Sequence, residues 1–263
     1  FDYAYSFADN GLALVQTGDK YGFIDKTGSY VIKPQFDSAY DFTGNGLAEV
    51  KVGDKYGFID KTGKYAINPQ FDDAYSFADN GLAAVETGGK YGYIDKDGKY
   101  VVNPQFDYAY SFADNGLALV HLGDQWGYID KTGAYVINPQ FDKAYYFQNG
   151  VAVVEVGGKY GLINKTGKYL VNPQYAELGT GIACNRIWFA NDEGKIGFLE
   201  ATGKEVISAQ FDYLYSSEYI SFSRGFYSDG YAIVRLGDKF GIIDKDGKYL
   251  VNPQFDGISH WDA

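Results

Sequence analysis

The chain has 263 residues, a net charge of −11 and an aromatic content of 18%, with 26 tyrosines and 19 phenylalanines. It is long enough to bury a sizeable core and too aromatic to be disordered. The negative charge argues against a nucleic-acid partner, because contacts to phosphates need clusters of lysine and arginine. No apolar run is long enough for insertion into a membrane.

The chain starts with Phe1 in the middle of a repeated motif and contains no methionine, so we expect it to be a piece of a longer protein. The single cysteine, Cys184, cannot form an internal disulfide and does not identify the compartment. We expect an extracellular or cell-surface location, with the cytoplasm as the alternative.

A stretch at residues 19–28 recurs along the chain and predicts a tandem-repeat fold. Its copies lie at 54–63, 89–98, 124–133, 158–167 and 238–247, with a degenerate copy at 193–203. The repeat gives seven units, 1–35, 36–70, 71–105, 106–140, 141–174, 175–210 and 211–254, and a stub, 255–263. Such an array buries its core by stacking neighbouring units, so we expect a single repeat domain over residues 1–263.

The third unit shows the elements expected in each repeat. Extended segments at 71–77, 82–86, 91–95 and 100–103 are separated by glycine-containing turns, and no segment has the apolar period of a helix. In each turn of the Asp-Lys-Thr-Gly type, we expect the aspartate to accept backbone N–H groups and the glycine to adopt a positive φ. Pro104 is expected to end the fourth strand, because proline cannot donate to a β-ladder.

The second, third and fourth segments are apolar on both faces, which indicates sheets packed between neighbouring sheets. An all-β chain of four-stranded units of this kind is β-propeller-like, with about seven blades. The alternative is an open β-superhelix, a solenoid of stacked β-meanders. Four strands and seven units favour the propeller, whereas the short unit and the surplus stub favour the open array.

The repeated pattern Asp-Lys-Tyr/Trp-Gly-Phe-Ile-Asp-Lys-Thr-Gly-Lys-Tyr-Val-Ile-Asn-Pro-Gln-Phe-Asp resembles the bacterial WG-repeat family over essentially the whole chain. The Trp-Gly pair of that family is kept only at Trp126-Gly127. The other copies carry Tyr21, Tyr56, Tyr91, Tyr160, Phe240 and Ile196 at this place. Because several kinds of ring serve here, we expect the ring to pack. The resemblance implies a repeat scaffold and no catalytic residues. The Asp-Lys-Thr-Gly-Lys turn also resembles that of quinoprotein-type propeller repeats.

Catalytic and metal sites find little support in the sequence. His121 lies at a variable position and His260 in the stub, so we expect neither to be a catalytic base. We expect Cys184 to be a buried apolar thiol. The turns 95–98 and 244–247 read Asp-Lys-Asp-Gly, but other copies replace the second aspartate by threonine, so we expect turn capping and no calcium. We expect no metal and no cofactor.

Two features could contact a ligand. A ladder of tyrosines recurs in the repeats, and we expect it to fill seams between sheets more readily than to stack sugars. Its members are Tyr5, Tyr40, Tyr75, Tyr110, Tyr145 and Tyr215. The irregular sixth and seventh units hold aromatic residues with arginine, which is the composition of a binding hot spot. These candidate ligand-binding residues are Arg186, Trp188, Tyr219, Phe222, Arg224, Phe226 and Tyr227. The alternative is that the irregular units cap the array.

The expected function is a non-enzymatic repeat scaffold that binds a protein or glycan partner. Two alternatives stay open at this point: a structural, self-assembling extracellular element such as a stalk or filament subunit, and the non-catalytic substrate-binding part of a larger enzyme. The regular units supply no set of convergent polar groups of the kind that an active site needs.

Overall fold

The computed structural model describes residues 1–213 and 225–258, and all of their regular secondary structure is β. Within these residues no helix is present that could cross a membrane. The chain divides into two compact units, Phe1–Pro139 and Gln140–Ala263. The expected all-β class is therefore confirmed.

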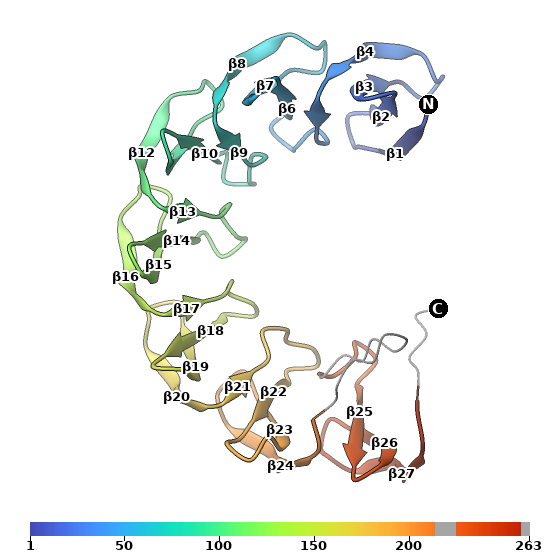
Figure 1. The fold of residues 1–263 in the computed structure, drawn as a ribbon, viewed down its shortest axis with the longest axis vertical. Helices are drawn as coiled ribbons and strands as arrows, with labels where there is room; N and C mark the ends of the chain where they lie inside the picture. The colour runs from blue at the N-terminus through green and yellow to red at the C-terminus, as the bar shows by residue number, and fades with distance from the viewer. Residues whose placement is uncertain (214–224, 259–263) are drawn as a thin grey trace. The chain divides into compact units, whose positions relative to one another are not determined.

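The first unit contains four sheets, each an antiparallel meander of four strands in chain order (Figure 1). The first sheet is β1 (Tyr3–Phe7), β2 (Ala13–Thr17), β3 (Lys20–Ile24) and β4 (Tyr30–Phe36). The second is β5 (Ser38–Ala39), β6 (Ala48–Val52), β7 (Lys55–Ile59) and β8 (Tyr65–Phe71). The third is β9 (Asp73–Ala74), β10 (Ala83–Thr87), β11 (Lys90–Ile94) and β12 (Tyr100–Phe106), and the fourth is β13 (Tyr108–Ala109), β14 (Ala118–Leu122), β15 (Gln125–Ile129) and β16 (Tyr135–Phe141).

The second unit continues the same pattern. The fifth sheet is β17 (Lys143–Ala144), β18 (Val151–Val156), β19 (Lys159–Asn164) and β20 (Tyr169–Tyr175). The sixth is β21 (Glu177–Leu178), β22 (Ile187–Ala190), β23 (Ile196–Leu199) and β24 (Glu205–Phe211), and the seventh is β25 (Tyr231–Leu236), β26 (Lys239–Asp244) and β27 (Tyr249–Phe255). In the seventh sheet a single bridge from Asp212 to Arg235 stands where the other sheets have their first strand.

These blade-like meanders make the fold β-propeller-like. Closure of the sheets into a ring, which the sequence favours, stays a prediction.

The repeated turns form as the sequence predicts. In the first sheet Asp25 Oδ1 accepts the backbone N–H of Thr27 at 2.8 Å and that of Ser29 at 3.1 Å. Gly28 follows with φ of 80°. A hydrogen bond from the Thr27 hydroxyl, together with these backbone donors, lowers the pKa of the exposed Asp25 carboxyl. The turn is therefore determined by its own residues.

Proline does not end the fourth strand, so that prediction is wrong. Strand β12 runs through Pro104 to Phe106. Tyr93 pairs with Val102, and Tyr91 pairs with Phe106. An advance of two residues along β11 therefore matches an advance of four along β12, and the extra residues of β12 form a bulge. Pro104 lies in this bulge at the sheet edge, where no partner needs its missing N–H.

The bulge explains the glycine of the repeated aromatic–glycine pair. A Cβ atom at Gly92 would lie 2.5 Å from the Val102 carbonyl oxygen and 2.7 Å from the Pro104 nitrogen. The same close approach recurs under the other bulges, at Gly22, Gly57, Gly127, Gly161, Gly197 and Gly241. Only glycine lets the bulged backbone pass this close, so the bulge and the glycine require each other.

The fourth strands also differ from expectation in their exposure. In β4, Ile32 and Phe36 are buried, whereas Tyr30 and Val31 are exposed. One face of this edge strand is therefore wet, and the prediction of two apolar faces holds only for the central strands. In Figure 1 the long strands β8, β12 and β16 lie along one side of their unit, with the short strands β9 and β13 on the opposite side.

The phenylalanine that opens each sequence unit ends the last strand of the preceding sheet. Phe71 completes β8, and the first strand of the third sheet is only the two-residue β9. The expected extended segment 71–77 is therefore split between two sheets. This link holds successive sheets together, because Phe71 is buried in the same cluster as Phe77 and Ile94 of the next sheet.

An aspartate after this phenylalanine bonds to two sheets. Asp37 Oδ2 accepts the Gly53 N–H of its own sheet at 2.7 Å, and its Oδ1 contacts Lys20 Nζ of the preceding sheet at 2.5 Å. Hydrogen bonds from Lys20 and from the Gly53 backbone lower the pKa of the exposed Asp37 carboxyl. Asp72 and Asp107 make the same two contacts in the following sheets, so these aspartates are structural.

Candidate functional site

Comparison of the repeats isolates one position on the second strand of each sheet. Equivalent cross-strand pairs place Leu14, Glu49, Ala84, Leu119, Val153, Trp188 and Ile233 at the same register position. We call it the variable position. Five sheets have an aliphatic side chain there, whereas Glu49 and Trp188 differ in kind from the others. Each of these two residues lines a cavity.

The larger cavity lies in the second unit and contains Trp188. It has a volume of about 870 Å³ and is lined by the fifth and sixth sheets, with Gly225 and Phe226 beside them. We call it the Trp188 groove. Tyr145 and Tyr160 of the fifth sheet line it too, as do polar side chains. The polar lining side chains are Gln148, Glu155, Glu177 and Thr180.

The charged groups of the Trp188 groove have defined partners. Lys143 Nζ lies 2.7 Å from Glu155 Oε2 and 5.9 Å from the centre of the Tyr160 ring. The hydrogen bond from Lys143 lowers the pKa of Glu155 and raises the pKa of the lysine. Glu177 Oε2 accepts the hydroxyl of Tyr213 at 2.7 Å. The groove is therefore aromatic and carries two carboxylates held by neighbouring side chains.

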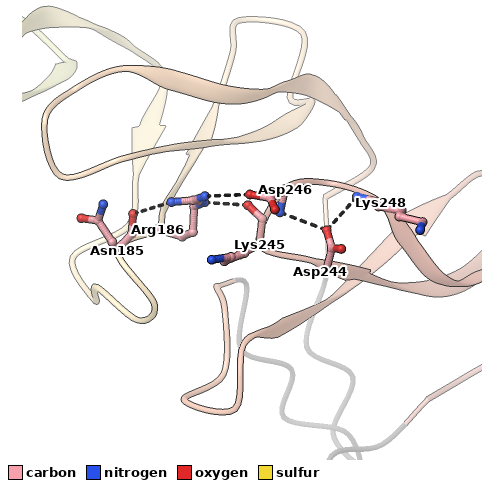
Figure 2. Close-up of polar contacts among 6 residues, drawn as sticks. All are labelled: Asn185, Arg186, Asp244, Lys245, Asp246 and Lys248. Carbon is pink, nitrogen blue, oxygen red and sulfur yellow. Dashed lines mark hydrogen bonds and ion pairs between the residues drawn. The ribbon is translucent and has the colours of Figure 1, made fainter.

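Arg186 does not line this groove, although the sequence groups it with Trp188. It is only 7% exposed. Its Nε donates to the carbonyl oxygen of Lys245 at 2.8 Å, and its Nη2 lies 3.6 Å from Asp246 Oδ1 (Figure 2). Sister sheets have leucine at the equivalent place, for example Leu12 in the first sheet. Arg186 thus fastens the sixth sheet to a turn of the seventh.

Phe226, which the sequence suggested as a ligand-binding residue, lines the Trp188 groove and also belongs to the repeated framework. Its ring centre lies 4.9 Å from that of Phe198, just as Phe77 lies 4.8 Å from Phe58 in the second and third sheets. It is 4% exposed. Tyr227 begins the following turn, since its N–H donates to the carbonyl oxygen of Tyr231. The remaining candidates, Tyr219, Phe222 and Arg224, lie outside the described residues.

The tyrosine ladder lies between sheets but reaches solvent, so the expectation that it fills the seams is only partly right. Tyr5 is 51% exposed and Tyr40 is 53% exposed, whereas Tyr75, Tyr110 and Tyr145 are half-buried. Tyr215 is outside the described part of the chain. Trp126, of the single Trp-Gly pair, is also half-buried and stacks on Tyr110 with ring centres 5.9 Å apart. Tyr40 and Tyr75 line one cavity and Tyr145 lines another, so these three rings pack and still border open space.

The other residues considered from sequence take structural roles. Asp244 Oδ1 accepts the backbone N–H groups of Asp246 and Lys248, so this carboxylate caps its turn (Figure 2). Over residues 1–213 and 225–258, no three acidic, histidine or cysteine side chains gather closely enough to hold a metal. Cys184 is half-buried, against the expected burial, and its thiol donates to the carbonyl oxygen of Tyr227 at 3.4 Å.

Sequence reasoning missed Glu49, Tyr160 and Glu155 as groove residues. The signal for Glu49 was available, because alignment of the units places a carboxylate where sister units have an aliphatic residue. Its burial and neighbours follow only from the packing of adjacent sheets.

Comparisons with known proteins agree on the repeat and assign no activity. The family model described as "WG containing repeat" matches residues 1–21, 21–56, 56–91, 91–125, 126–160, 160–194 and 240–262. A search of curated proteins finds no match.

Solved structures resemble the chain at low identity. That of a eukaryotic initiation factor has a TM-score of 0.52 and 10% identity, covering 91% of this chain and 73% of that one. The computationally designed Ika8 protein has a TM-score of 0.47 and 13% identity, covering 93% and 84%. BamB from Moraxella catarrhalis has a TM-score of 0.42 and 12% identity, covering 94% and 89%. These similarities concern the fold alone.

Proposed function

The chain belongs to the family of WG-containing repeats, and on that premise we propose that it is a non-enzymatic scaffold that binds a protein partner in the Trp188 groove. One observation carries the proposal: the regular repeat places an aliphatic residue at the variable position, and the sixth sheet replaces it with a tryptophan in an open groove. Tryptophan and tyrosine are the residues most often found at the energetic centre of protein interfaces.

The charges of the chain favour a partner segment with basic residues. The net charge is −11, and the groove contains the carboxylates of Glu155 and Glu177. Complementary charge speeds encounter and selects partners. The aspartates of the regular repeats are engaged in turns and in bonds between sheets, as at Asp25 and Asp37, which supports a scaffold more than an active site.

Site-specific photocrosslinking tests this proposal. A photoreactive phenylalanine analogue is placed at residue 188 and, as a matched control, at residue 126, whose tryptophan lies in a regular repeat. We expect a protein crosslinked at residue 188 and not at residue 126. A crosslinked glycan, or equal labelling at both residues, contradicts the proposal.

Affinity for the recovered partner gives a second measurement. Trp188→Ala should weaken binding by 2 kcal/mol or more, about 30-fold, as is typical of a hot spot. Trp126→Ala should change affinity by less than about 3-fold, because it lies on another sheet. Circular dichroism of both variants separates lost contact from lost folding. Equal affinities of the two folded variants would exclude the Trp188 groove.

A further inference from the structure

A second cavity, in the first unit, differs from the Trp188 groove in its chemistry. It has a volume of about 490 Å³ and lies where the second and third sheets adjoin. We call it the Glu49 cavity. Three tyrosine rings, two carboxylates and two serine hydroxyls line it. These residues are Tyr40, Glu49, Tyr56, Asp73, Tyr75, Ser76 and Ser111.

Glu49 is buried, and no basic side chain of residues 1–213 or 225–258 forms an ion pair with it. Its side chain is only 3% exposed, and the one hydrogen bond that the structure gives it comes from the Ser76 hydroxyl to Oε2 at 3.1 Å. A charged group in such a place is costly unless a counter-ion compensates it. Burial, with a further contribution from the Asp73 carboxylate, raises the pKa of Glu49 to about 7.

The fold does not need a carboxylate at this place. Sister sheets fill the variable position with Leu14, Ala84 and Leu119, and they keep the same strand pairing. A buried carboxylate destabilises the fold, and these sister sheets avoid it with an aliphatic residue. Its presence at residue 49 therefore points to a function. Such polar exceptions in an otherwise regular fold are where functional sites are expected.

The remaining charged groups around the cavity are few. Asp73, on β9, accepts the Tyr91 hydroxyl at 2.7 Å through Oδ2. Lys51, on β6, places its ammonium 4.9 Å from the centre of the Tyr56 ring. Tyr56, which lines the cavity, therefore already contacts one ammonium group, and a ligand in the cavity would make the same kind of contact.

We propose that the Glu49 cavity binds a primary alkylammonium group, with Glu49 and Asp73 accepting its N–H donors and the tyrosine rings enclosing its alkyl chain. An ammonium has three donors and no acceptor, which suits carboxylates and serine hydroxyls. Aromatic faces attract cations, more strongly when the site is desolvated. The ring-lined cavity suits an organic cation better than a hard metal ion, which needs six or more oxygen ligands.

The ammonium group can come from a free amine or from a lysine side chain of a partner protein. Calorimetry at pH 8 in phosphate buffer separates these sources. One arm uses 1,5-diaminopentane, and the other uses an acetylated, amidated Gly-Gly-Lys-Gly-Gly peptide. n-Butanol and the same peptide with ε-acetyllysine serve as neutral controls. We expect the two ammonium probes to bind and the neutral controls not to bind. The tighter probe identifies the source.

The variants test the site itself. Glu49→Gln keeps the size of the side chain and should lower affinity at least 10-fold, and Asp73→Asn should lower it less. Asp79→Asn, an exposed carboxylate on a neighbouring turn, should leave it unchanged. Wild-type affinity should also fall about 10-fold from pH 8 to pH 6, because Glu49 becomes neutral while the amine stays charged.

Two results would overturn the proposal. One is no saturable heat from either ammonium probe up to about 10 mM, well above a Kd of ~1 mM for a weak site. The other is equal affinity in wild type and in folded Glu49→Gln, which would place the bound amine elsewhere. Neither result bears on the Trp188 groove, which lies in the other unit, so this proposal and the proposed function can fail separately.

Discussion

The ionisation of Glu49 should make the stability of the chain fall as pH rises, and a single isosteric substitution isolates the effect. The folded-state pKa of about 7 lies above the ordinary value of 4.5, which we take for the unfolded chain. Between these values the folded state binds more protons than the unfolded state, so the free energy of unfolding decreases with pH. The destabilisation is absent below the unfolded pKa and complete above the folded pKa.

The magnitude follows from the difference of the two pKa values. A shift from 4.5 to about 7, at 1.36 kcal/mol per pKa unit, corresponds to about 3 kcal/mol of destabilisation at pH 8. Glu49→Gln removes the titration and keeps a side chain that the Ser76 hydroxyl can contact. The variant should therefore gain about 3 kcal/mol relative to wild type when both are moved from pH 4.5 to pH 8.

Urea denaturation at the two pH values, followed by tyrosine and tryptophan fluorescence, measures this difference. Phosphate and acetate buffers are required, because Tris carries a primary amine of the kind that we propose as ligand. Asp79→Asn is the control, and its difference from wild type should be the same at both pH values. A Glu49→Gln difference that changes by less than about 0.5 kcal/mol between pH 4.5 and pH 8 would refute the reasoning, since it would mean that Glu49 titrates like an exposed carboxyl.

Three further predictions concern the framework. Gly92→Ala should destabilise the fold by about 3 kcal/mol or more, because the added Cβ meets the backbone of β12. The control Gly116→Ala, at φ of 81° with open space around it, should destabilise it by about 1–2 kcal/mol. Equal losses of stability in urea denaturation would contradict the bulge contact. Arg186→Met should destabilise the fold by about 1–3 kcal/mol, because it loses the hydrogen bond to the Lys245 carbonyl. Asp246→Asn should change stability by less than about 0.5 kcal/mol, because the Asp246 side chain is exposed and lies 3.6 Å from Arg186. The reverse order in urea denaturation would assign the contact to the ion pair. A chelator should leave the melting temperature unchanged, because Asp95 and Asp244 each use one carboxylate oxygen to accept backbone N–H groups of their own turn. A clear drop in melting temperature would reveal a structural metal.

The parts of the fold that depend on neighbouring residues were predictable from the sequence. The turn at Asp25 forms from the carboxylate, the following backbone N–H groups and Gly28, all within four residues. Because the sequence repeats, the same turn forms again in other sheets. The bulge at Pro104 was not predictable in this way, because it depends on the register between β11 and β12, which no single strand determines.

The candidate sites show the same division between local and tertiary information. The sequence pointed to Trp188 because its unit is irregular, and the structure places it in a groove. It grouped Arg186 and Phe226 with Trp188 on composition alone. Phe226 does line the Trp188 groove, whereas Arg186 is buried in contacts between the sixth and seventh sheets. A segment that contains arginine and aromatic residues has the same composition whether the arginine faces a partner or a neighbouring sheet. Only the burial of the side chain distinguishes the two cases.

A tandem repeat supplies its own control for such decisions, because each sheet solves the same packing problem. Where nearly all copies agree, as at the aspartate that follows the opening phenylalanine, the residue is explained by bonds within the repeat. Glu49 and Trp188 both occupy the variable position, where the other sheets have aliphatic residues. Glu49 introduces a carboxylate there, and Trp188 introduces a large aromatic surface. A single structural demand cannot favour both changes. The two ligands that we propose, each suited to its own cavity, would account for both changes and leave the strand pairing of every sheet unchanged.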